Sequence, residues 1–95
     1  MVGPHIPDDQ EGTAVQWSDV EIIIQDRHPA VRDMFRFLRW DHLPPELAKV
    51  SQPFTVLALQ LLDLPDDPEL SAALRKLREA KDCAVGLAAW TRDHA

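Results

Sequence analysis

The chain has 95 residues, 45% of them hydrophobic, which suits the packed core of one small domain. Its net charge is −6, from 10 Lys and Arg against 16 Asp and Glu, and this excess of carboxylates argues against binding to duplex nucleic acid. Cys83 is the single cysteine, so no internal disulfide can form and a reducing compartment is expected. No signal-peptide pattern opens the chain, and an apolar run such as residues 56–59 is far shorter than the ~20 residues of a membrane span. We therefore expect a cytoplasmic protein, located in the cytoplasm of a host cell, with no membrane contact.

The first quarter of the chain divides into a polar start and an apolar segment. Residues 1–14 are rich in Gly, Pro and Asp with little to bury, and we predict a mobile tail. In residues 15–25, Ser18 followed by Glu21 forms a capping-box pattern that predicts a helix. The three consecutive isoleucines at 22–24 would also suit a buried strand. Because the chain has no second convincing strand to pair with it, we favour the helix.

A second helix is predicted from Pro29. His28 precedes this proline and marks a break, since the residue before proline avoids helical angles. One apolar face recurs at helical spacing: Val31, Met34, Phe35 and Leu38. A second face carries three cations: Arg32, Arg36 and Arg39. This helix is expected to end near residues 40–43, ahead of Pro44 and Pro45.

Two matched apolar seams follow, joined by a turn at residues 65–68. The first seam begins after Pro45 and has alternating spacings of three and four: Leu47, Val50, Phe54, Leu57, Leu61 and Leu64. The second begins after Asp67, a good N-cap, and Pro68: Leu70, Ala73, Leu77, Ala80, Ala84 and Leu87. This pattern predicts an antiparallel helical hairpin over residues 44–93.

The predicted fold is all-α: the hairpin plus one or two N-terminal helices, in a single domain over residues 15–95. Pro53 lies inside the first arm, where it removes a backbone hydrogen bond, so a kink is expected there. Several apolar residues fall outside both seams: Leu59, Leu62, Leu74 and Val85. Because an isolated hairpin would expose them, we expect oligomerisation through the hairpin.

The sequence offers no candidate for catalysis. The four histidines are scattered, and no phosphate loop, nucleophile elbow or paired-carboxylate motif is present. Cys83 lies among alanines and is interpreted as a small packed residue rather than a nucleophile. No Cys and His spacing fits a metal site. We expect a binding protein without catalytic residues, metal or cofactor.

Two clusters suggest binding of an anion. One is a run of cations in the last helix: Arg75, Lys76, Arg78 and Lys81. Arginine forks match phosphate oxygens, although the same run also fits a solvated helix face paired with Glu79 and Asp82. The other interleaves aromatic and basic side chains: Arg36, Phe37, Arg39, Trp40 and His42. Aromatic faces beside guanidinium groups suit nucleobases and phosphates, although these rings would also suit packing on the hairpin.

Three segments between residues 37 and 85 carry a resemblance to a known group. They are residues 41–47 (DHLPPEL), 51–54 (SQPF) and 74–85 (LRKLREAKDCAV). In these segments the chain resembles short bacteriophage proteins that end in a proline-kinked helix, a Pro-Asp turn and a charged second helix. That group is similar to the hairpin domain of phage cyclic-nucleotide sponges, which counter the CBASS and Thoeris immune systems.

The resemblance implies a homo-oligomer, often a hexamer, that sequesters cyclic di- or trinucleotides between subunits without cleaving them. It would place ligand phosphates near the four cations of the last helix. Sponges of this type stack a tyrosine on a base; this chain has no tyrosine, so Phe37 or Trp40 would take that place. Two alternatives stay open: a small helical module that docks on a host protein, and a minor component of the virion.

Overall fold

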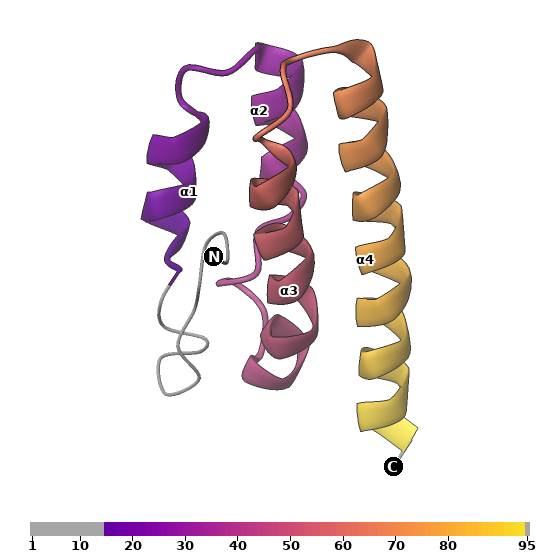
Figure 1. The fold of residues 1–95 in the computed structure, drawn as a ribbon. Helices are drawn as coiled ribbons and strands as arrows, with labels where there is room; N and C mark the ends of the chain where they lie inside the picture. Colours follow the sequence, from indigo (N-terminus) through magenta and orange to yellow (C-terminus); the bar gives the residue numbers. More distant parts are fainter. Residues whose placement is uncertain (1–14, 95) are drawn as a thin grey trace, which may run out of the picture.

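The computed structural model describes residues 15–94, which form four α-helices with no β-strand among them (Figure 1). In chain order these are α1 (Trp17–Ile24), α2 (Pro29–Arg36), α3 (Pro45–Leu61) and α4 (Pro68–His94). The prediction of an all-α fold is therefore confirmed. The tail predicted at residues 1–14 lies outside the described residues. None of the helices in the described range is long and apolar enough to cross a membrane.

The ambiguous segment at residues 15–25 is helical, and its N-terminus differs from the prediction. The helix α1 begins two residues earlier than a Ser18 cap would place it. The backbone N–H of Gln16, the N-cap residue, donates to the Asp19 carboxylate over 2.9 Å. Val20 and Ile24, four residues apart, are buried, whereas Ile22 is 63% exposed. The isoleucine run therefore does not form one buried face, as a central strand would require.

The helix α2 starts at Pro29 as predicted, and the ring Nδ1 of His28 accepts a hydrogen bond from the N–H of Ala30. It ends at Arg36, several residues before the predicted end. The chain beyond it still enters the core, because Leu38 is fully buried although it lies outside the helix. The hydroxyl of Thr55 on α3 donates to the backbone carbonyl of Leu38. This bond satisfies a carbonyl that a longer helix would have paired internally.

The helices α3 and α4 run antiparallel, side by side, and α4 also packs on α2 (Figure 1). Asp67 accepts a hydrogen bond from the N–H of Glu69 over 2.8 Å, so the predicted N-cap before Pro68 is confirmed. Arg92 near the end of α4 pairs with Glu46 in the first turn of α3 over 3.2 Å. Pro53 lies inside α3, which continues as a helix on both sides of it.

The buried stripe of α3 is rotated away from the predicted seam. The buried residues are Leu47, Ser51, Thr55 and Ala58. Leu57 and Leu64, both assigned to the seam, are 45% and 52% exposed. The physical reason is that α3 is covered on two sides, by α4 and by the core that α1 and α2 contribute. Small side chains in the centre of the stripe allow this close approach.

The second arm also differs from its predicted seam. Leu74, which was placed outside the seam, is fully buried, and Leu87, which was placed inside it, is 66% exposed. Leu70 and Leu74 lie on the face of α4 that enters the core shared with α2 and α3. Two other residues placed outside the seams, Leu59 and Leu62, are half-buried and pack against that core. The inner face of α4 is therefore set by two helices, α2 and α3, rather than by one arm of a hairpin.

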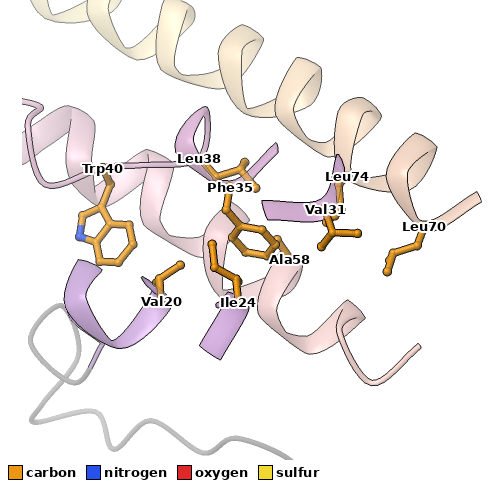
Figure 2. Packing of buried hydrophobic residues seen from close by; sticks show 9 residues of the cluster. All are labelled: Val20, Ile24, Val31, Phe35, Leu38, Trp40, Ala58, Leu70 and Leu74. Atoms are coloured by element: carbon orange, nitrogen blue, oxygen red, sulfur yellow. The ribbon is translucent and has the colours of Figure 1, made fainter. Parts of the chain in front are cut away.

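The core is one continuous cluster to which every helix contributes (Figure 2). Its buried members are Val20, Ile24, Val31, Phe35, Leu38, Trp40, Ala58, Leu70 and Leu74. Phe35 is the largest side chain that is completely enclosed. Burying apolar side chains of this size stabilises the fold by about 1.5–3 kcal/mol each, before the entropy cost of ordering them.

Arg27 ties the connection between α1 and α2 to the end of α3. Its guanidinium donates to the carbonyl oxygens of Leu62 and Leu64, each over 2.7 Å, and to the Asp66 carboxylate over 2.8 Å. The backbone N–H of His28 donates to the second oxygen of Asp66 over 2.8 Å. The hydrogen bond from the His28 N–H is the largest cause that lowers the pKa of Asp66, and the hydrogen bond from Arg27 lowers it further. We refer to Arg27 and Asp66 as the loop clamp.

Candidate anion-binding surface

The two clusters predicted from the sequence meet where the end of α2 lies against α4. The guanidinium carbon of Arg78 lies 3.8 Å from the ring centroid of Phe37, the residue that follows α2. Arg36, the last residue of α2, places its guanidinium carbon 5.3 Å from the same ring. Both distances lie within the ~6 Å of a cation–π contact. We refer to Arg36, Phe37 and Arg78 as the Arg-Phe cluster.

The Arg-Phe cluster is open to solvent and only partly neutralised. Phe37 is 36% exposed. Asp82 pairs with Arg78 over 3.6 Å, and the two side chains are 53% and 37% exposed. Exposed pairs of this kind contribute little and are screened by salt, so a phosphate can compete with Asp82 for the guanidinium. Arg75 is exposed and lies about 60° around the helix from Arg78, close enough to share an anion with it.

The other two cations of the predicted basic run do not join this cluster. Lys76 is exposed and lies about 160° around α4 from Arg78, on another face of the helix. Lys81 points along the inner face of α4: its side chain is only 12% exposed and its ammonium pairs with Asp82 over 2.7 Å. Four cations close in sequence are thus divided among three faces of α4, and of these four Arg78 is the one that contacts Phe37.

The aromatic and basic segment at residues 36–42 is divided as well. Trp40 is 6% exposed and meets Trp17 edge to face, with ring centroids 6.1 Å apart. Arg39 lies 5.1 Å from the ring centroid of Trp17 and donates two hydrogen bonds to Asp41. His42 is exposed in the segment before α3. Trp40 is therefore a core residue, as the packing interpretation expects, and its ring is not presented at the surface.

The ion pair beside Trp17 has a defined electrostatic effect. The hydrogen bonds between Arg39 and Asp41 are the main cause that lowers the pKa of Asp41 and raises the pKa of Arg39, and the attraction between the two charges acts in the same direction. This pairing holds the Arg39 guanidinium away from Phe37. Of the cations in the segment, only Arg36 contacts the Phe37 ring.

A second surface feature, an apolar stripe on the outer side of α4, was not recognised in the sequence. Its four members are all exposed and recur at spacings of three and four: Ala80, Cys83, Leu87 and Trp90. We refer to these residues as the outer stripe of α4. The free thiol of Cys83 is exposed, which corrects the expectation of a packed residue. In the sequence, these residues form a second pattern with spacings of three and four beside the predicted seam. Two such patterns on one helix do not show which of them faces the core.

Residues 15–94 contain no group of three or more His, Cys, Asp or Glu side chains placed to hold a metal ion. The chain matches no described protein family, no curated protein and no solved structure.

Proposed function

We propose that this protein binds a small anionic ligand that carries a nucleobase, a cyclic di- or trinucleotide, at the Arg-Phe cluster, and sequesters it without cleavage. The observation that supports this proposal is the contact of Arg78 with Phe37. It joins residues that are 41 positions apart into one solvent-exposed group with a cationic and an aromatic part. A phosphate suits the two-pronged arginines, and the exposed part of Phe37 can pack on a base.

The surrounding charges favour a ligand of this class over a long polyanion. The chain has a net charge of −6, so phosphates extending beyond the cluster would meet carboxylates. Arg36, Arg75 and Arg78 supply three cations, which suits two or three phosphates. The proposal extends to the biological role that the resemblance implies, in which a phage-encoded protein removes a host immune messenger from solution. It also extends to self-association, since the exposed apolar side chains of the hairpin need cover.

The proposal is tested by thermal-shift and calorimetric titration of the purified protein with a panel of cyclic di- and trinucleotides. A ligand at 100 times its dissociation constant adds about 2.7 kcal/mol to the free energy of unfolding. For a domain of this size, that raises the melting temperature by roughly 10–20 °C. No shift with any member of the panel, together with no small molecule released from the purified protein on heating, refutes it.

Substitutions within the chain provide matched controls. Arg78→Met and Phe37→Ala should each weaken binding at least tenfold, because each removes one half of the cation–π pair and its ligand contacts. Lys76→Met, on another face of α4, should leave the affinity within about twofold while changing the net charge as Arg78→Met does. Equal losses from Lys76→Met and Arg78→Met would show that only the overall charge matters and would contradict the site.

A second function, docking of a helix face on a host protein, is favoured by a different observation. Leu87 and Trp90 on α4 are 66% and 59% exposed, which is unusual for large apolar residues lying together on one helix. A stable monomer that captures one host protein at a fixed ratio and binds no nucleotide would support this function instead.

A further inference from the structure

The outer stripe of α4 faces solvent, and its Trp90 ring stacks on His94 of the same helix with ring centroids 4.2 Å apart. Leu87 and Trp90 are 66% and 59% exposed, Ala80 and Cys83 are exposed as well, and none of them belongs to the buried core. Their spacings of three, four and three are those of alternating a and d positions in a helix–helix seam. Lys76 and His94 continue the same spacing at either end. Together with these two flanking residues, the stripe spans 19 residues of α4, about 28 Å of helix.

We propose that the partner of this stripe is the same stripe on a second copy of the chain, with the two α4 helices antiparallel. The two small side chains, Ala80 and Cys83, lie toward the N-terminal end of the stripe, and the two large ones, Leu87 and Trp90, lie toward its C-terminal end. Antiparallel pairing therefore sets small side chains against large ones. Placing Cys83 opposite Leu87 of the second copy also places Ala80 opposite its Trp90. Each layer then contains one large and one small residue, which keeps the helix separation even along the seam.

A parallel pair would not pack as well. It would place Trp90 opposite Trp90, Leu87 opposite Leu87 and Ala80 opposite Ala80, so the required helix separation would change from layer to layer. It would also place Lys76 opposite Lys76, a like-charge layer. In the antiparallel register Lys76 lies opposite His94 of the second copy and one residue from its Asp93, a carboxylate that also pairs with Arg92 of its own chain.

Gly86 gives independent support for this register. It is exposed, and a Cβ added to it would meet nothing within 4 Å, so no contact within residues 15–94 requires a glycine there. A glycine in a helix interior costs roughly 0.5–1 kcal/mol relative to alanine. In the antiparallel register the two Gly86 residues flank the two-fold axis on one side of the seam, and the two Ala84 residues flank it on the other. Small residues at these positions allow two helix backbones to approach closely.

This pairing rests on the self-association in the proposed function but not on the ligand. Arg78 and Phe37 lie on the opposite side of α4, about 160° from the stripe, so the Arg-Phe cluster stays open in the dimer. The contact is one helix wide, which puts it at the low end of specific interfaces, below about 1,200 Å² of total buried surface. A dissociation constant of roughly tens of micromolar is therefore expected.

The first test is sedimentation equilibrium of the full chain from about 1 µM to about 1 mM, a range that extends well below and well above a dissociation constant of roughly tens of micromolar. The mass should rise from one to two chains across this range. Leu87→Glu should remove the dimer, whereas Ile22→Glu should leave it intact, because Ile22 has nearly the same exposure, 63%, but lies on α1. A monomer at all concentrations, or equal loss in both variants, would overturn the proposal. Nucleotide binding that persists in Leu87→Glu separates this interface from the ligand site.

The second test determines the direction of the helices by oxidative cross-linking. The native chain has only Cys83, which in the antiparallel register lies four residues away from its counterpart along the seam. The variant Leu87→Cys should form a disulfide-linked dimer between Cys83 and the new thiol of the second copy. The native chain and the single-thiol control Leu87→Cys/Cys83→Ser should not. Cross-linking of the native chain through Cys83 indicates a parallel pair and overturns the register, as does a sedimenting dimer whose Leu87→Cys form does not cross-link.

Discussion

Two leucines on α4, thirteen residues apart, provide the sharpest test of the fold. Leu74 is fully buried and Leu87 is 66% exposed, the reverse of the prediction, which has Leu87 in the seam and Leu74 outside it. Leu74→Ala removes buried atoms and leaves a cavity that the neighbours fill only partly, at a cost of about 3 kcal/mol. Leu87→Ala removes atoms that water already contacts, so its cost in a monomer should stay below about 0.5 kcal/mol. On a chain of 95 residues the first change lowers the melting temperature by roughly 12–24 °C.

The assay is urea unfolding followed by circular dichroism at 222 nm, with the protein at about 1 µM so that self-association contributes little. The midpoint should fall strongly for Leu74→Ala and hardly change for Leu87→Ala, with the slope unchanged in both. If Leu87→Ala lowers the free energy of unfolding as much as Leu74→Ala does in dilute solution, α4 is rotated about its axis relative to the structure. The core assignment, and with it the face that carries Arg78, would then be wrong.

Four further predictions follow from named contacts. Arg27→Met should lower the free energy of unfolding by about 1–2 kcal/mol, measured by urea unfolding, because two carbonyls lose their donor at a partly exposed site. The lowered pKa of Asp66 contributes stability that is complete above its unfolded pKa and is lost as pH falls through the lower folded pKa, so Asp66→Asn should flatten the acid limb of a melting-temperature profile. Thr55→Val should cost about 1–2 kcal/mol in the same unfolding assay, since the Leu38 carbonyl loses its donor. Ser51→Ala should instead raise the melting temperature, because its buried hydroxyl has no hydrogen-bond partner within the described part of the chain. A loss of stability from Ser51→Ala equal to that from Thr55→Val would show that the Ser51 hydroxyl is paired after all.

The local features of the sequence determined where most helices begin. Pro29, Pro45 and Pro68 each start a helix as predicted, because proline suits the first turn and lacks only a donor that would be unpaired there. The all-α class followed from apolar spacing and from the lack of a second strand. The start of α1 was wrong by two residues because Gln16 and Asp19 form the cap instead of Ser18 and Glu21.

The sequence predicted the kind of site, a group of cationic and aromatic side chains, but not which of these side chains lie together. The sequence singled out Phe37 and Arg78 separately, in two clusters, and gave no reason to join them. Their contact depends on α2 packing against α4, which brings together positions far apart in the chain. Trp40 is instead buried beside Trp17 of α1, and most of the Lys81 side chain is covered. Composition alone cannot separate a surface cation from one whose stem lies between helices.

Sequence by itself determined the helices and their apolar stripes, because helix starts and side-chain periodicity depend on residues within a few positions of one another. Only the tertiary structure decided which stripe of each helix is buried. Two stripes of apolar residues at spacings of three and four run along α4, and their periodicity does not distinguish them. The packing of α2 and α3 buries the stripe that contains Leu74. The choice is made by shape, since the small side chains of Ser51, Thr55 and Ala58 let the helices approach closely on that side. The stripe left outside, with Leu87 and Trp90, is then available for a partner.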